Sequence, residues 1–274
     1  MTHMDEHIAF IGGGNMASAI ISGLLRKGVP PARIDVVEPF EETRHKLREQ
    51  FGVLVHAQAG SAITQATVVV WAVKPQQFKE AAKQVKAYTP NALHLSVAAG
   101  IRSDSIAQWL DNEHIVRAMP NTPALIGKGI TGLYARPAVT PAQRHTVQMV
   151  VETTGDFVWL NTEQQLDAVT AISGSGPAYV FYFLEAMTET GTTMGLPRDQ
   201  AYKLAVATFV GAGELAKQSS EPPEILRQRV TSKGGTTYAA TTSMDESGMK
   251  ELFAKALFAA QKRATELGDE FGAA

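Results

Sequence analysis

The chain has 274 residues, more than one typical domain of about 100–150 residues, so two domains are favoured. Its composition, 45% hydrophobic and 19% charged, is that of a folded globular protein and excludes wholesale disorder. A formal charge of −2 indicates neither a nucleic-acid nor an anionic-membrane partner, and the absence of cysteine excludes disulfides, thiolate metal sites and a cysteine nucleophile. Because the start of the chain is polar and no long apolar run follows, we expect a cytoplasmic protein without a membrane helix.

Short β-branched runs alternate with helical patterns in the first part of the chain. This alternation predicts βαβ units and a mainly parallel sheet. A helix is predicted over residues 15–26, and Thr140 and Pro141 form the expected start of another that reaches about Val151. The predicted strands are residues 8–11, 34–37, 68–73, 93–97, 115–119 and 157–160.

After Asn161 the pattern becomes helical. Helices are predicted over residues 177–194 and 199–217, and a third follows from an apolar stripe at helical spacing. That stripe consists of Met249, Leu252, Phe253, Ala256, Leu257 and Ala260. We therefore predict an α/β domain at residues 1–161 and an all-α domain at residues 162–274. Helices that are apolar nearly all round indicate a subunit interface, and a monomeric helical cap is the alternative.

The first functional signal is a glycine-rich turn between the first predicted strand and helix. The run from Gly12 to Ala17 fits the pattern G-x-G-x-x-G/A in its proper context. Gly12 permits the tight turn, Gly14 lets a pyrophosphate approach the backbone, and Ala17 keeps the helix close to the strand. The helix start then supplies free N–H groups and a positive dipole for phosphates. This predicts a Rossmann-like dinucleotide-binding domain, and a turn without a ligand is the alternative.

Glu38 follows the second strand, 21 residues after Ala17 (38 − 17). An acid at this place commonly binds the adenosine ribose 2′-OH and favours NAD over NADP. Arg44 is the nearest following cation and could instead meet a 2′-phosphate. The pattern leaves this choice open, as it leaves open a merely solvated glutamate.

Three further loops follow predicted strands, where ligands of doubly wound sheets lie. They comprise residues 73–75, 96–100 and 119–123. Lys74 could face a phosphate or simply be solvated. The prolines of the third loop could belong to the site or could serve merely to shape a turn. Small residues in the second loop would let a flat nicotinamide ring lie against the backbone.

Two polar, small-residue segments interrupt the helical half, at residues 173–179 and 232–237. Serine and threonine at such places are first of all helix caps. Gly234 and Gly235, however, expose backbone N–H groups beside hydroxyls, which suits a small carboxylate. The second segment is therefore a candidate substrate site.

The residue types and their spacing argue against metal catalysis and against a serine nucleophile. None of the seven histidines lies in the helical half of the chain and we expect no metal, and no serine stands in a nucleophile elbow. A nicotinamide supplies its own hydride, so the protein needs only to position and polarise the acceptor.

Six segments, taken in order along the chain, resemble pyrroline-5-carboxylate reductases. They are residues 10–17, 72–75, 96–100, 117–123, 173–179 and 232–237. The resemblance implies reduction of 1-pyrroline-5-carboxylate to proline, the last step of proline biosynthesis, with NADPH, or alternatively NADH, as cofactor. It also implies a homodimer formed by the helical domains, often assembled into a decamer, with a site shared between subunits.

The resemblance assigns roles to individual residues. Its cofactor-binding set is Ile11, Gly12, Gly13, Gly14, Asn15, Met16, Ala72, Val73, Lys74, Pro75, Val97, Ala98 and Ala99, to which the ribose argument adds Glu38. Its substrate-binding set is Asn121, Ser232, Gly234, Gly235, Thr236 and Thr237. Thr237 is the catalytic candidate, through a hydrogen bond to the ring nitrogen, and no residue stands out as a general acid.

Two positions depart from the family pattern. Lys233 stands where many members carry proline, and Glu38 argues for NADH whereas the family generally prefers NADPH. Two other functions remain open. One is a β-hydroxyacid-type dehydrogenase, which would use a lysine of the helical domain as acid/base. The other is a non-catalytic dinucleotide sensor.

Overall fold

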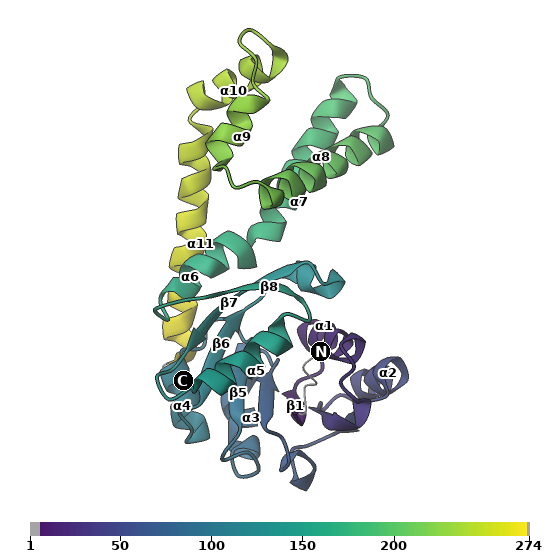
Figure 1. Ribbon diagram of the computed structural model, residues 1–274, viewed down its shortest axis with the longest axis vertical. Coiled ribbons are helices and arrows are strands. Elements are labelled where there is room, and N and C mark those ends of the chain that lie inside the picture. The colour runs from purple at the N-terminus through teal and green to yellow at the C-terminus, as the bar shows by residue number, and fades with distance from the viewer. Residues whose placement is uncertain (1–5, 273–274) are drawn as a thin grey trace. The chain divides into compact units, whose positions relative to one another are not determined.

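The computed structural model describes residues 6–272, and its elements are shown in Figure 1. The chain forms two compact units. The first contains residues 1–175 together with residues 260–274, and the second contains residues 176–259. No helix among the described residues has the length and apolarity needed to cross a membrane.

The first unit is built on one eight-stranded sheet with the strand order β3-β2-β1-β4-β5-β6-β7-β8. Only the β6–β7 pair is antiparallel, which confirms the predicted mainly parallel sheet. The strands are β1 (Ile8–Ile11), β2 (Ile34–Val37), β3 (Leu54–His56), β4 (Val68–Trp71), β5 (Leu93–Ser96), β6 (Ile115–Met119), β7 (Gly129–Ala135) and β8 (Gly155–Trp159).

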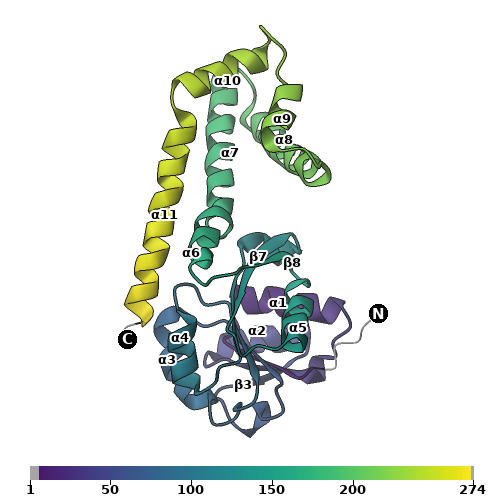
Figure 2. The ribbon, with the colours of Figure 1, turned by 60° about the vertical axis from the view of Figure 1, so that its left-hand side comes forward.

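Helices cover both faces of this sheet (Figure 2). One face packs against α1 (Asn15–Arg26), α2 (Glu41–Phe51) and α5 (Pro141–Val151), and the other against α3 (Pro75–Val85) and α4 (Ser103–Leu110). Residues of β1 alternate between the two cores, because successive side chains of a strand point to opposite faces. The central strands are therefore apolar on both sides, as a sheet covered by helices requires.

The predicted start of α5 is confirmed in detail. Thr140 is the N-cap, with Pro141 at the first helical position. The Thr140 hydroxyl accepts from the backbone N–H of Gln143 at 3.2 Å, and the Gln143 side chain accepts from the Thr140 N–H at 2.9 Å. This reciprocal pair is a capping box and explains why the helix begins at this position.

Two strands, β3 and β7, were missing from the sequence prediction, and two predicted strands end earlier. The strands predicted over residues 68–73 and 93–97 stop at Trp71 and Ser96, where the chain leaves the ladder for loops at the carboxyl edge. β7 contains glycines that depress strand propensity. They are required by close packing, because a Cβ at Gly132 would lie 2.8 Å from a side-chain methyl of Val169.

The second unit is helical, as predicted. An aromatic cluster joins α7, α8 and α11, with Phe183 6.5 Å from Phe209 and 5.9 Å from Phe253 between ring centroids. A Cβ at Gly191 would lie 3.0 Å from Ala201, so glycine allows α7 and α8 to approach closely. The helices are α7 (Gly176–Thr193), α8 (Arg198–Gln218), α9 (Pro223–Arg229), α10 (Thr236–Glu246) and α11 (Met249–Gly272), whose last residues belong to the first unit.

Ion pairs attach the segment after β8 to the sheet, and a hydrogen bond attaches the end of α11 to that segment. In that segment, α6 (Gln165–Val169) continues into a short π-helix (Thr170–Gly174). Just before α6, the Glu163 carboxylate accepts from Arg117 of β6 at 2.6 Å. Asp167 accepts two bonds from Arg102, at 3.0 and 2.9 Å, and one from the Thr265 hydroxyl at 3.0 Å. Burial lowers the pKa of Arg117, and the Glu163 carboxylate opposes that shift.

Candidate functional site

A cavity of about 570 Å³ lies at the carboxyl ends of β1, β2 and β4. β2 and β4 flank β1, so this is the point where the strand order reverses, the place at which doubly wound sheets bind ligands. The cavity is lined by Ile11, Gly12, Gly13, Gly14, Val37, Glu38, Pro39, Phe40, Thr43, Ala57, Ala72, Val73, Lys74, Gln76, Gln77, Glu80, Ala81 and Gln84.

Gly12 makes the turn that leads from β1 to α1. Its φ of 92° lies in the left-handed region, and its N–H donates to the Val37 carbonyl at 2.9 Å. A Cβ at this position would lie only 2.7 Å from the Ala72 carbonyl oxygen. Both the conformation and the space therefore require glycine, as predicted for the first glycine of the motif.

Gly14 differs from Gly12 in its surroundings. It is the N-cap of α1, and a Cβ built on it meets nothing within 4 Å. No protein atom therefore excludes a side chain here, although the position faces the cavity. The first amides of a helix have no partner within the helix and attract anions. The open space at Gly14 thus fits the pyrophosphate of a dinucleotide.

The Glu38 carboxylate joins the glycine turn to the end of β2. Oε2 accepts from the Gly13 N–H and Oε1 from the Phe40 N–H, both at 2.9 Å. Nearby, Nη1 of Arg44 donates to the backbone carbonyls of Glu38 and Pro39, at 2.9 and 2.6 Å. Glu38 is thus held in the cavity wall, whereas Arg44 does not line the cavity.

The loops after β4 and β5 continue the ladder at the same edge. The Ala72 N–H donates to Ile11 at 2.8 Å, and the Val97 N–H donates to Trp71 at 3.0 Å. Pro75 begins α3 directly after Lys74, whose side chain is exposed. The loop after β5 lines a separate small cavity of about 30 Å³ with Met119 and the C-terminal part of α11.

The predicted cofactor residues are distributed as follows. Those in the main cavity are Ile11, Gly12, Gly13, Gly14, Glu38, Ala72, Val73 and Lys74. Ala98 and Ala99 lie in the small cavity. The others, Asn15, Met16, Pro75 and Val97, adjoin these residues in the chain and line neither cavity.

The Asn121 side chain holds backbone in the first unit. Its Nδ2 donates to the Ser173 carbonyl at 3.1 Å, and its Oδ1 accepts from the Ile130 N–H at 3.0 Å. These bonds join the loop after β6 to β7 and to the π-helix. Asn121 is therefore positioned by both ends of its amide.

The second unit carries the glycine-rich turn before α10. Gly234 has a φ of 75°, and the Gly235 N–H donates to the Ser232 carbonyl at 3.0 Å. Gly235 is the N-cap of α10, where the Ala239 N–H donates to the Gly235 carbonyl at 3.1 Å. The amides of Thr236 and Thr237 lie before that bond, in the first turn, where helices leave N–H groups unpaired. The turn is therefore suited to a carboxylate.

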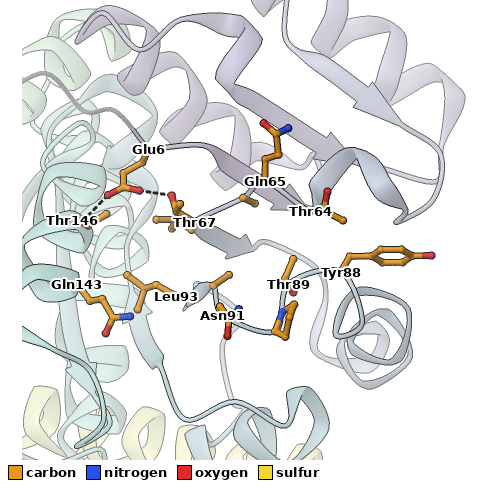
Figure 3. A pocket seen from close by; sticks show the side chains of 14 residues that line it. Glu6, Thr64, Gln65, Thr67, Tyr88, Thr89, Asn91, Leu93, Gln143 and Thr146 are labelled. Atoms are coloured by element: carbon orange, nitrogen blue, oxygen red, sulfur yellow. Dashed lines mark hydrogen bonds between the residues drawn. The ribbon is translucent and has the colours of Figure 1, made fainter.

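Another cavity, of about 440 Å³, lies at the amino ends of β4 and β5 (Figure 3). It is lined by threonine, asparagine and glutamine side chains and by Glu6, whose carboxylate accepts from the hydroxyls of Thr67 and Thr146. Doubly wound sheets bind their ligands at the carboxyl ends of the strands, which is the other edge of this sheet. The cavity at the carboxyl edge is the better cofactor candidate. Among the described residues no cluster could hold a metal ion.

Several residues of the main cavity were not predicted. Gln77, Ala81 and Gln84 are spaced at i, i+4 and i+7 along α3, so one helix face lines the cavity. That spacing, directly after the loop of Lys74, was the available signal. Phe40, which is 64% exposed, could have been noticed as an aromatic residue next to Glu38.

Comparison with known proteins adds to this geometry. One family model, described as pyrroline-5-carboxylate reductase dimerisation, matches residues 163–267. Another, described as NADP oxidoreductase coenzyme F420-dependent, matches residues 7–100. The pyrroline-5-carboxylate reductase of Pseudomonas aeruginosa is 43% identical, over 97% of this chain and 98% of that protein. The chain belongs to the pyrroline-5-carboxylate reductase family. The Haemophilus influenzae member is 41% identical, over 95% of this chain and 97% of its own length.

Solved structures of pyrroline-5-carboxylate reductases share the fold. The Coxiella burnetii protein is 38% identical with a TM-score of 0.91, and the match covers 96% of this chain and 99% of that one. The Plasmodium falciparum protein, whose crystal structure contains NADP, is 25% identical with a TM-score of 0.84, covering 96% and 98%. The predicted combination of a Rossmann-like domain with a helical region is therefore confirmed, and the protein is an oxidoreductase.

Proposed function

We propose that this chain reduces 1-pyrroline-5-carboxylate to L-proline with NAD(P)H, the last step of proline biosynthesis. The observation that carries the proposal is the open space at Gly14, at the start of α1, in a chain of this family. A non-catalytic sensor would need only this cofactor cavity. The glycine-rich turn before α10 is a second candidate binding site, for the substrate, and it therefore favours an enzyme over a sensor.

The cofactor would be held mainly by backbone. The run from Ile11 to Met16 would bind the pyrophosphate, and residues 72–75 and 97–99 would flank the nicotinamide and its ribose. Bound there, the nicotinamide supplies a hydride to the imine carbon of the substrate. Small residues such as Ala98 and Ala99 leave the backbone accessible to a flat ring.

The substrate would be bound by the turn before α10. Backbone N–H groups of Gly234, Gly235 and Thr236 would receive its carboxylate, with Ser232 beside them and Asn121 as a wall of the site. The Thr237 hydroxyl would hydrogen-bond the ring nitrogen and so orient the imine. Protonation makes the imine carbon electrophilic, and we assign the proton to the substrate or to water.

The second unit supports a homodimer. Large apolar side chains are exposed on its helices, including Tyr182 at 70%, Leu215 at 70% and Phe258 at 68%. Exposed apolar surface on this scale indicates a protein interface. We propose that residues 162–274 form the substrate-binding and dimerisation domain, that dimers assemble further into a decamer, and that the site is shared between subunits. The cytoplasmic location stays a prediction.

One assay separates the candidate functions. Oxidation of NADH and NADPH is followed with 1-pyrroline-5-carboxylate, and reduction of NAD⁺ and NADP⁺ with a panel of β-hydroxyacids. Turnover with the imine alone supports the proposal. Turnover with a hydroxyacid indicates the dehydrogenase alternative, and binding of a cofactor without any turnover indicates a sensor. Sedimentation of the same preparation measures the oligomeric state.

A further inference from the structure

Glu38 presents a fixed negative charge to the cofactor cavity. Glu38 is only 6% exposed. One carboxylate oxygen accepts a hydrogen bond from the Gly13 N–H and the other accepts one from the Phe40 N–H. An ionised carboxylate offers about four acceptor positions, so about two remain after these bonds. The two N–H groups, one from the turn after β1 and one from the loop after β2, fix the direction of the carboxylate. It is therefore ready to accept from a ligand hydroxyl without first ordering its side chain.

Among the described residues, the part of the cavity lining that follows β2 contains no basic side chain. Nη1 of Arg44 is bound to the carbonyls of Glu38 and Pro39, and the residue does not line the cavity. Lys74 does line it, but it follows β4, on the other side of β1 from β2. Glu80 also lines the cavity, but it too follows β4, and its carboxylate pairs with Lys83 at 3.1 Å. The β2 side of the cavity thus favours a neutral, hydrogen-bond-donating group over an anion.

We propose that Glu38 makes this chain selective for NADH over NADPH. The inference rests on the proposed function, since it requires the cavity to hold a nicotinamide dinucleotide with its adenosine ribose beside β2. There, a ribose 2′-OH would donate to a free lone pair of the carboxylate. A 2′-phosphate would place a second anion against a buried one, which is strongly unfavourable. The same side chain therefore attracts one cofactor and repels the other.

The direct test is equilibrium binding. NADH and NADPH are titrated into the full-length wild-type protein without substrate, with nicotinamide fluorescence as the readout. We expect NADH to bind at least about tenfold more tightly, the scale of a hydrogen bond to a charged group. Equal affinities, or tighter binding of NADPH, would overturn the proposal.

Variants identify the residue responsible. Glu38→Ser, with Glu38→Gln as the second variant should the first not fold, is expected to lower the NADPH-to-NADH ratio of dissociation constants by about tenfold or more. Arg44→Gln is the matched control and should change that ratio by less than about threefold. An unchanged ratio in both Glu38 variants would refute the role of Glu38. A selective loss of NADPH affinity in Arg44→Gln would show that Arg44 meets a 2′-phosphate.

Measurements of turnover distinguish a failure of the proposed function from a failure of the proposed selectivity for NADH. kcat/KM for each cofactor with 1-pyrroline-5-carboxylate should show the same preference as binding. If neither cofactor is oxidised, the proposed function fails, while the ratio of dissociation constants still decides the role of Glu38. If both are oxidised but NADPH is preferred, the selectivity is wrong and the proposed function stands.

Discussion

Acidification from pH 7 to pH 4 should destabilise the first unit through the imidazole of His94. This side chain lies in β5 and is 1% exposed. Its Nδ1 accepts from Nε1–H of Trp71 at 3.0 Å, so the ring proton is on Nε2. Burial lowers the pKa of His94 to about 4, a shift that a backbone hydrogen bond at Thr89 opposes. Protonation of Nδ1 would place two donors against each other in the core.

The size and sign of the effect follow from this pKa. The ordinary value of 6.5 applies to the unfolded chain, and the folded value is about 4. As the pH falls below 6.5, the unfolded state therefore takes up the proton first. Its free energy falls relative to that of the folded state, so the protein becomes less stable. Since a tenfold change in proton affinity is about 1.4 kcal/mol, roughly 3 kcal/mol of stability, fully present above pH 6.5, is lost by about pH 4.

Urea unfolding at a series of pH values measures this loss. Other groups titrate as well, so the informative quantity is the difference between wild type and His94→Asn, whose amide oxygen can still accept from Trp71. The difference should change by about 3 kcal/mol between pH 6.5 and 4. His145→Asn, which removes an exposed imidazole of α5, is the matched control and should follow wild type. A difference that stays flat across this range for His94→Asn would contradict the reasoning.

Three further predictions concern the two sites and the ion pairs. Gly14→Val should fold but lose cofactor binding in titrations, because its side chain meets no protein atom and fills the pyrophosphate space, whereas Gly12→Val should lower the unfolding free energy. Thr237→Ala should reduce kcat/KM by about 5- to 150-fold, and unchanged kinetics would refute its role. Asp167→Asn, which weakens a two-bond pair with Arg102, should cost about 1–3 kcal/mol in urea unfolding.

The sequence predicted the features that depend on local patterns. The β-branched runs gave the central parallel strands, and Thr140 with Pro141 located the start of α5, because capping is satisfied within a few residues. The glycine-rich turn was recognised for the same reason, since its conformation follows from neighbouring residues. Most of the cavity lining that directly follows β1 and β4 could therefore be predicted from the sequence.

Features that depend on contacts far apart in the chain could not be predicted in this way. Gly132 weakens the pattern of β7, and only its approach to Val169 explains why glycine stands in a strand. Asp167 accepts from Arg102, 65 residues earlier, and from Thr265, 98 residues later, so nothing local marks the attachment of α6 and the end of α11 to the sheet. The fixed direction of the Glu38 carboxylate likewise depends on the distant Gly13.

Both proposed anion sites use backbone N–H groups at helix starts, α1 after Gly14 and α10 after Gly235. Such a site needs no basic side chain, because unpaired amides and the helix dipole provide the positive potential. This explains how a chain with 25 basic and 27 acidic residues could bind a pyrophosphate and a carboxylate without an overall positive charge. It also means that side chains around these turns are free to set selectivity. Glu38 takes the N–H of Gly13 but leaves the amides at the start of α1 to the pyrophosphate, so it can discriminate against a 2′-phosphate at the ribose.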